Sequence, residues 1–306
     1  MKILIQNRRR SLWQGGDYTQ LDYTVEALRK LGYEIDISEQ YVVSPETIEK
    51  YDLVHLWNFS MEWTKFQLWV ARKHKKPVIC SMIYHESDAF IPYNLQQIMM
   101  DELSYAIFQT KGEMERAKRH LTIKDEQIKY IPNGIDSFWL EISQSRLPME
   151  RFVLTVGRIE PSKGQLTTAK VCKDLGIAYI CIGEIMDVDY ARKCMENGAE
   201  IKQPMKKEEL KPWYYSANVY IQPSKAETWS LCVDEALSQG TPCILTEMCE
   251  RELPVIRCKW EDYESIKSSI QKAIEMKKDF TLSESLKTWD SVAQDISKLY
   301  EEISKI

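Results

Sequence analysis

The chain has 306 residues, of which 44% are hydrophobic and 28% are charged, as in an ordinary soluble globular protein. This length predicts two domains of about 150 residues, and no apolar run approaches the roughly 18 residues of a membrane-spanning helix. The net charge of −5 argues against broad nonspecific binding of nucleic acid.

The chain start and the cysteines indicate a cytoplasmic protein. The apolar start is too short, and is followed too soon by basic residues, to be a signal peptide. The 8 cysteines include no Cys-x-x-Cys pair and no Cys/His spacing that suits zinc. We therefore expect reduced thiols.

Strands and helices alternate along the first half of the chain. Strands are predicted at 2–6, 34–37, 53–57, 77–83, 105–109 and 127–131, and helices at 18–31, 45–51, 65–74, 95–103 and 111–121. This alternation predicts a parallel sheet with right-handed crossovers, and ligands of such sheets bind beyond the carboxyl ends of the strands.

The segment after the first strand contains a basic cluster and a pair of glycines. Arg8, Arg9 and Arg10 suit a phosphorylated acceptor such as a lipid, polymer or nucleic acid, although a solvated loop is slightly favoured. Trp13 is one of several aromatic residues that could stack on a sugar or base. Gly15 and Gly16 form either a flexible ligand-binding loop or a simple tight turn. Asp17 is a candidate cap of the following helix.

Two histidines end predicted strands. His55 lies in an apolar strand and is assigned no role, whereas His85 follows the strand at 77–83 and is a candidate functional residue. The basic stretch 111–124 is a candidate for peripheral contact with an anionic membrane, but its Glu113 and Glu115 favour a solvated face.

The second half repeats the alternation of strands and helices. Strands are predicted at 152–156, 178–182, 200–202, 219–222 and 243–245. The polar, aperiodic stretch near 141–148 predicts a domain boundary there. A last helix at 289–303 has a one-sided apolar stripe.

Two turns at predicted strand ends contain charged residues. Arg158 and Lys163 follow the strand at 152–156, and both side chains suit phosphate oxygens. Glu227 follows the strand at 219–222, and Glu235 lies in the next helix, which ends at Gly240. A turn that feeds a helix start can hold a phosphate on its free amides, and the carboxylates can accept hydrogen bonds from sugar hydroxyls.

These motifs resemble the retaining glycosyltransferases of family 4, also called glycosyl transferases group 1. The resemblance rests on Val156-Gly157-Arg158 with Lys163-Gly164, on Pro132-Asn133-Gly134-Ile135-Asp136, and on Glu227-x7-Glu235 before Gly240-Thr241-Pro242. It implies the GT-B fold, an α/β fold of two Rossmann-like doubly wound domains facing across a cleft. We expect an acceptor-binding domain at 1–145, a nucleotide-sugar-binding domain at 146–285, and a C-terminal helix at 286–306 that packs back on the first domain.

The resemblance also implies roles for single residues. Glu235 would bind the ribose hydroxyls and Glu227 the donor sugar, while Arg158 and Lys163 would stabilise the leaving diphosphate. His85 would lie near the transferred sugar. The other donor-binding candidates are Gly15, Gly16, Gln203, Pro204, Trp229, Ser230, Leu231 and Cys232, and the acceptor candidates are Arg8, Arg9, Arg10, Trp13, Asp17 and His85.

The expected function is metal-independent transfer of a hexose or pentose from a nucleotide-diphosphate sugar, with no cofactor. The acceptor would be a glycan, a lipid-linked or other phosphorylated molecule, or a nucleic-acid base. Asp187 and Asp189 have the Asp-x-Asp form of a metal site, but acids at a helix start are common. Ser230 stands where the family usually has glycine, so the family pattern does not determine the donor sugar. The alternatives are a nucleotide-sugar epimerase of the same fold and a non-catalytic protein that binds sugar or nucleic acid. Donor, acceptor and oligomeric state stay open.

Overall fold

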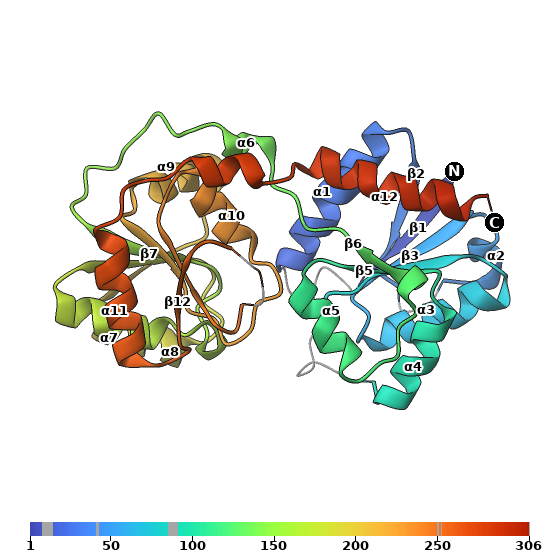
Figure 1. Ribbon diagram of the computed structural model, residues 1–306, viewed down its shortest axis with the longest axis horizontal. Helices are drawn as coiled ribbons and strands as arrows, with labels where there is room; N and C mark the ends of the chain where they lie inside the picture. The colour runs from blue at the N-terminus through green and yellow to red at the C-terminus, as the bar shows by residue number, and fades with distance from the viewer. Residues whose placement is uncertain (8–14, 41–42, 85–90, 250, 252, 306) are drawn as a thin grey trace. The chain divides into compact units, whose positions relative to one another are not determined.

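The computed structural model describes residues 1–7, 15–40, 43–84, 91–249, 251 and 253–305 (Figure 1). Internal contacts divide the chain into two compact units. The first consists of Met1–Gly134 with Lys287–Ile306, and the second of Ile135–Leu286.

The first unit contains a six-stranded parallel sheet in the order β2-β1-β3-β4-β5-β6. Its strands are β1 Lys2–Gln6, β2 Glu34–Ser38, β3 Leu53–Trp57, β4 Val78–Ser81, β5 Tyr105–Phe108 and β6 Ile128–Tyr130. Its helices are α1 Gly16–Lys30, α2 Pro45–Ile48, α3 Glu62–Lys73, α4 Tyr93–Glu102, α5 Lys111–Lys118, the 3-10 turn η2 Asp125–Gln127, and α12 Trp289–Ile303.

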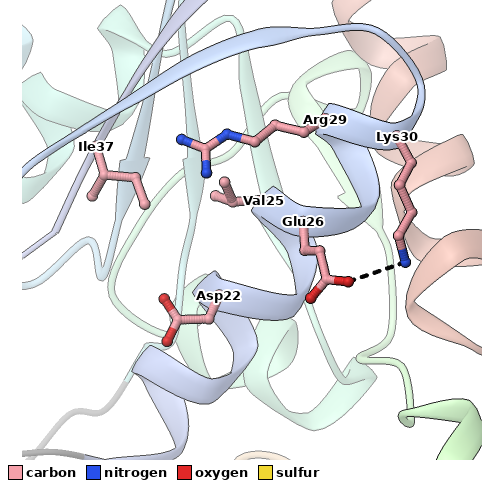
Figure 2. Close-up of a pocket in the computed structure, with 6 residues that line it drawn as sticks. All are labelled: Asp22, Val25, Glu26, Arg29, Lys30 and Ile37. Carbon is pink, nitrogen blue, oxygen red and sulfur yellow. Dashed lines mark ion pairs between the residues drawn. The ribbon is translucent and has the colours of Figure 1, made fainter.

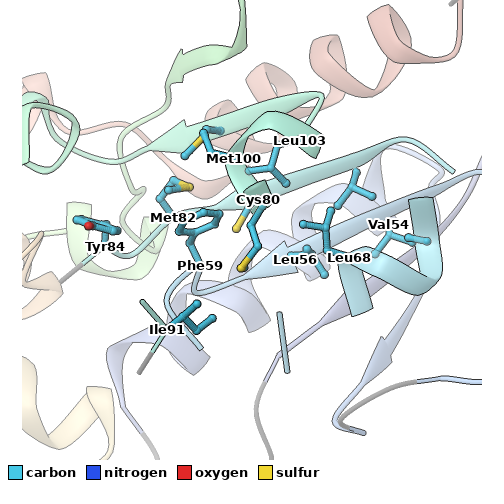
Figure 3. Packing of buried hydrophobic residues seen from close by; sticks show 14 of the residues in the cluster. Val54, Leu56, Phe59, Leu68, Cys80, Met82, Tyr84, Ile91, Met100 and Leu103 are labelled. Carbon is cyan, nitrogen blue, oxygen red and sulfur yellow. The ribbon is translucent and has the colours of Figure 1, made fainter. Parts of the chain in front are cut away.

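The central strands of this sheet are buried along their whole length. All five residues of β3 and all four of β4 are buried, as expected for a parallel sheet covered on both faces. Figure 3 shows how side chains of β3, β4 and the neighbouring helices pack into one apolar cluster. This burial explains why the sequence pattern located these strands.

The last helix belongs to the first unit. Helix α12 packs along α1, and the rings of Tyr23 and Trp289 stack with centroids 5.8 Å apart (Figure 1). The hydroxyl of Tyr300 lies 2.8 Å from Nδ1 of His55, whose Nε2 lies 3.0 Å from the Ser81 hydroxyl. His55 is therefore a buried structural residue, consistent with assigning it no role.

The second unit contains another six-stranded parallel sheet, in the order β12-β11-β10-β7-β8-β9. Its strands are β7 Phe152–Val156, β8 Ala178–Ile182, β9 Ala199–Lys202, β10 Val219–Gln222, β11 Cys243–Thr246 and β12 Ile256–Cys258. Its helices are α6 Ser137–Leu140, α7 Gln165–Leu175, α8 Val188–Glu196, α9 Lys207–Ser216, α10 Leu231–Ser238 and α11 Tyr263–Ile274, with the 3-10 turns η3 Pro161–Lys163 and η4 Thr281–Ser285.

The contacts group residues 135–145 with the second unit, although the sequence placed the boundary after residue 145. Ile135 and Trp139 belong to the apolar core of that unit. The amide of Ser143 donates to the side chain of Gln239 over 2.9 Å. The polar stretch that marked the boundary in the sequence is thus attached to the second unit by the core residues before it and by a hydrogen bond from within it.

Some features differ from the sequence expectation. Strand β12 and helix α11 were not predicted, and both lie in the polar region after residue 250. Helix α1 begins at Gly16 with Gly15 as its N-cap, so Asp17 lies inside the first turn and does not cap the helix. The Gly15 carbonyl accepts from the Tyr18 amide, which starts the helix two residues earlier than predicted.

The eight cysteines are unpaired thiols, and all except Cys232 are buried. Among the described residues, no helix is both long and apolar enough to cross a membrane.

Candidate functional site

The charged residues of the second unit gather beyond the carboxyl ends of neighbouring strands. Strand β10 pairs with β7, so the turn after Val156 and the turn after Gln222 lie at the same edge of the sheet. The amide of Lys225 in one turn donates to the carbonyl of Ser162 in the other over 2.8 Å.

Close backbone approach at this edge depends on glycines. A Cβ atom at Gly164, whose φ is +68°, would lie 2.1 Å from the Pro223 carbonyl oxygen. A Cβ at Gly183 would lie 2.0 Å from the carbonyl oxygen of Gly157. The glycines that marked the turns in the sequence therefore set the distance between the loops that surround the site.

Lys163 and Glu227 form an ion pair at the centre of this edge. The Nζ of Lys163 lies 2.5 Å from Oε1 of Glu227, and the two side chains are only 17% and 14% exposed. The same oxygen accepts from Ser224 over 2.9 Å and from Gln222 over 3.0 Å. Tyr220 in turn fixes the Gln222 side chain with a hydrogen bond of 2.5 Å. The sequence motif is thus held by a network that begins inside the sheet.

Burial raises the pKa of Glu227, but Lys163 and the hydrogen bonds of Ser224 and Gln222 outweigh it and hold that pKa below its ordinary value. Glu227 is therefore a carboxylate at neutral pH. All three partners lie on Oε1, and no described residue donates to Oε2. One acceptor oxygen remains for a ligand hydroxyl.

Glu235 has a different electrostatic setting. It lies on α10, half-buried, and Oε2 accepts from the Tyr214 hydroxyl over 2.6 Å. Burial is the main cause that raises its pKa, to about 7, and the nearby carboxylates Asp234 and Asp136 add to the effect. Hydrogen bonds from the Tyr214 hydroxyl and the Cys232 thiol partly offset this rise.

The residue before α10 has an unusual backbone. Ser230 is the N-cap of that helix with φ of +61°, in the left-handed region that favours glycine. Its side chain makes no capping bond, and the amides that follow are those of Leu231 and Cys232, both partly exposed. The chain keeps the turn that glycine would allow, at a cost in backbone strain.

Three buried side chains brace the turn around Glu227. The indole Nε1 of Trp229 donates to Asp234 Oδ2 over 2.7 Å, and the guanidinium of Arg251 lies 3.6 Å above the indole ring. Arg251 also forms an ion pair of 2.5 Å with Asp234, and these two side chains are 8% and 2% exposed. We call these three residues the Trp229–Asp234–Arg251 brace.

The brace joins two loops. Trp229 belongs to the turn after β10, and Arg251 to the segment after β11. Arg257 binds that second segment through the carbonyls of Thr246, Cys249 and Arg251. Because Glu227 forms a parallel bridge with Cys249, the brace and this bridge hold the same pair of loops together. Trp229 is itself 8% exposed, so it acts within the brace and offers little surface to a ligand.

The other donor-site candidates lie around this edge. Arg158 pairs with Glu160 over 3.0 Å and is partly exposed. Gln203 and Pro204 lie in an exposed loop after β9. The loop is at the carboxyl end of the outermost strand of the same sheet.

Few candidates of the first unit can be placed. Arg8, Arg9, Arg10, Trp13 and His85 lie outside the described residues. Gly15, Gly16 and Asp17 start α1, and a Cβ at Gly16 would meet no atom within 4 Å, so close packing does not demand glycine there.

The end of β4 is held firmly. Ile83 has φ of +44°, a strained value for a β-branched residue. The Tyr84 amide donates to Glu113 over 2.8 Å, and its carbonyl accepts from Arg116 over the same distance. Glu113 is fully buried, and burial raises its pKa to about 7. The glutamate that suggested a solvated face for this helix instead points into the protein.

The first unit has a hollow of about 610 Å³ that is lined by residues of α1 and by Ile37. Figure 2 shows these side chains. Lys30 and Glu26 form an ion pair of 3.2 Å at its side, and none of the candidate site residues lines it.

The Asp-x-Asp motif is part of a helix start. Asp187 caps α8 by accepting from the Tyr190 amide over 2.9 Å, and Asp189 is exposed and lies 3.7 Å from Arg192. Among the described residues, no group of three or more His, Cys, Asp or Glu side chains is placed to hold a metal ion.

Several residues of the site were not singled out from the sequence: Tyr214, Gln222, Ser224, Asp234 and Arg251. Gln222 and Asp234 had a signal, because each is a polar residue at a position whose neighbours predict burial. Tyr214 and Arg251 had none, since they reach the site from other elements.

Comparisons with solved structures agree with the fold described above. The chain superposes on the sucrose-phosphate synthase of Thermosynechococcus elongatus with a TM-score of 0.79 at 16% identity, covering 99% of this chain and 98% of that one. For Anabaena HepE in complex with UDP the TM-score is 0.81 at 14% identity, with 99% and 100% covered. For a glycosyltransferase of Rickettsia africae the TM-score is 0.78 at 11% identity, covering 99% of this chain and 98% of that one. The chain thus has the GT-B fold.

The site itself lies in a recognised sequence domain. Residues 150–275 match the family model described as glycosyl transferases group 1, a range that contains Arg158, Lys163, Glu227 and Glu235. No curated protein sequence matches the chain.

Proposed function

We propose that the protein is a retaining glycosyltransferase of family 4, which transfers a sugar from a nucleotide-diphosphate sugar to an acceptor without a metal ion. The observation that supports this most is the Lys163–Glu227 pair of 2.5 Å at the carboxyl ends of β7 and β10. It brings a phosphate-binding cation and a hydroxyl-binding carboxylate together in the matched family domain.

The proposed roles follow from the two glutamates and the two cations. Oε2 of Glu227 would accept a hydrogen bond from a hydroxyl of the donor sugar. Glu235 would accept hydrogen bonds from the ribose hydroxyls. Lys163 would turn from Glu227 toward the diphosphate, and Arg158 would assist as the glycosidic bond breaks, because cations placed where negative charge develops lower the barrier.

The donor is proposed from the solved relatives. HepE is described in complexes with UDP and with UDP-glucose. We therefore propose a uridine diphosphate sugar as the first donor to test. The acceptor stays a prediction from the sequence: an anionic molecule bound near Arg8, Arg9, Arg10, Trp13 and Asp17, with His85 near the transferred sugar. A nucleic-acid acceptor is the least favoured, given the net charge of −5.

Binding is tested by thermal shift and calorimetry with UDP, GDP, ADP, CDP and dTDP and their sugar conjugates, each with and without EDTA. We expect one nucleotide to stabilise the protein equally in both buffers. Lys163→Ala should weaken binding of that diphosphate at least about tenfold, because a charge-assisted contact is lost. Lys170→Ala, an exposed lysine on α7, is the matched control.

Turnover decides between the proposal and its alternatives. Transfer with retained anomeric configuration, followed by NMR, is the expected result. Interconversion of nucleotide sugars without an acceptor would indicate the epimerase. Binding that is unaffected by Glu227→Gln and produces no turnover would indicate a binding protein. A response to no nucleotide at all would refute the donor site.

A further inference from the structure

Helix α3 exposes two aromatic side chains. Phe66 is 39% and Trp69 is 48% exposed, and their rings meet edge to face with centroids 6.3 Å apart. The Nζ of Lys65 lies 4.6 Å from the centre of the Phe66 ring. The opposite side of the helix is buried, for instance at Leu68 and Ala71, so α3 has an apolar inner side and an aromatic outer one.

The same segment has a strong local positive charge. The sequence from Glu62 to Lys76 contains the acid Glu62 and the basic residues Lys65, Arg72, Lys73, Lys75 and Lys76, whereas the whole chain has a net charge of −5. Arg72 pairs with Glu102 over 2.8 Å, and Lys76 donates to the Glu49 carbonyl. Lys73 and Lys75 are exposed and have no ion pair with a described residue.

Helix α4 extends this surface. The Arg72–Glu102 pair joins α3 to α4, and both helices connect parallel strands that are neighbours in the sheet, so they run in the same direction. Ile98 is 52% exposed and lies one turn before Glu102, as Trp69 lies one turn before Arg72. Residues one turn apart share a helix face, so Ile98 lies on the face of α4 that bears Glu102, the partner of Arg72 on α3.

We propose that this surface, formed by Phe66, Trp69, Ile98, Lys73 and Lys75, docks on a bilayer that contains anionic lipid. Tryptophan and phenylalanine enter the boundary between headgroups and acyl chains, and lysine ammonium groups bind anionic headgroups. Single exposed apolar residues need no explanation, but an exposed aromatic pair beside unpaired lysines has the chemistry of a membrane-surface helix. This inference does not depend on the proposed function.

The test is co-sedimentation with vesicles of phosphatidylcholine alone and of phosphatidylcholine mixed with phosphatidylserine. We expect binding to the mixed vesicles that weakens as salt is raised, and little binding to the neutral ones. Phe66→Ser with Trp69→Ser should weaken binding more than tenfold. Loss of one positive charge near the membrane is expected to weaken binding about fivefold. Lys73→Glu with Lys75→Glu reverses two charges, so this double variant should weaken binding more than fivefold for each residue changed.

Matched controls come from the second unit. Met186→Ser with Val188→Ser removes two other exposed apolar side chains, and Lys170→Glu with Lys193→Glu reverses two other exposed lysines. Both control variants should bind as the unchanged protein does.

Equal binding to both kinds of vesicle, no binding to the anionic ones, or equal losses in the controls would overturn the proposal. So would self-association that the Phe66/Trp69 variant abolishes in the absence of vesicle binding, because the surface would then contact a second copy of the chain. Thermal unfolding of each variant checks the fold.

Discussion

Glu235 and Glu227 are glutamates of one motif with opposite electrostatic settings. Glu227 is surrounded by an ammonium group and two hydrogen-bond donors, which lower its pKa. Burial and, to a smaller extent, two nearby carboxylates raise the pKa of Glu235 to about 7, against the opposing hydrogen bond from the Tyr214 hydroxyl. Near neutral pH the first is charged, whereas the second is close to half protonated.

This difference predicts a pH dependence of nucleotide binding. A carboxylate accepts two ribose hydroxyls, whereas a protonated carboxyl loses part of that capacity. Affinity for the nucleotide should therefore be highest above pH 7 and should fall as pH decreases from 8 to 6. Calorimetric titration over this range measures the effect. Glu235→Gln should bind weakly at every pH without this trend, and a trend that persists in the variant would assign it to another group.

The backbone of Ser230 gives a second prediction. At φ of +61° a serine is strained, glycine is not, and a β-branched residue is worse than either. Ser230→Gly should leave the free energy of unfolding within about 1 kcal/mol of its starting value, since relief of strain and loss of unfolded-state restriction act in opposite directions. Ser230→Val should lower it by more than about 1 kcal/mol. Chemical denaturation compares the two, and equal stabilities would mean that the turn is not strained.

At the scale of elements, the Trp229–Asp234–Arg251 brace links the turn after β10 to the segment after β11. The ion pair is almost fully buried, so its two charges depend on each other. Removing one partner leaves an uncompensated charge in the protein interior, whereas removing both leaves none.

We therefore expect Arg251→Leu to lower the free energy of unfolding by about 3–5 kcal/mol. Asp234→Leu combined with Arg251→Leu should cost clearly less than the sum of the single changes. Denaturant unfolding of all four proteins forms a double-mutant cycle. Additive losses would show that the two side chains do not act as a pair. If the single variants unfold, Arg251→Lys keeps the charge and tests the stacking alone.

At the scale of the whole molecule, buried titratable groups set the response to pH. Burial lowers the pKa of His55 to about 3, while burial raises that of Glu113 to about 7. Unfolded histidine binds a proton near pH 6.5, so the His55 contribution to stability is present above that pH and is lost as pH falls toward 3. The contribution of Glu113 has the opposite sign, being present below about pH 4.5 and lost as pH rises toward 7.

We predict that His55 costs the protein about 2 kcal/mol of stability between pH 6.5 and pH 5. His55→Gln should be less stable at pH 7, because the hydrogen bonds to Tyr300 and Ser81 are disturbed, but should lose less stability over this interval. Denaturation at several pH values measures both slopes. Equal slopes for the two proteins would contradict the prediction.

The sequence by itself determined the α/β class, the order of the strands along the chain, and the glycines and charged residues at strand ends. These features are local, because buried parallel strands are short apolar runs and their turns need glycine. Strand β3 and helix α12 were predicted with the bounds that the structure has. Strand β12 was missed because only its last residue is buried, which leaves no apolar run.

The tertiary structure decided which charged and polar side chains contact one another. Three contacts depend on which strands are neighbours in the sheet: Lys163 with Glu227, Tyr214 with Glu235, and Arg251 with Asp234. The sheet order β12-β11-β10-β7-β8-β9 differs from the chain order, so residues up to 64 positions apart meet at one edge. The pKa values follow from the same contacts, because burial and neighbouring charges exist only once the sheet has formed.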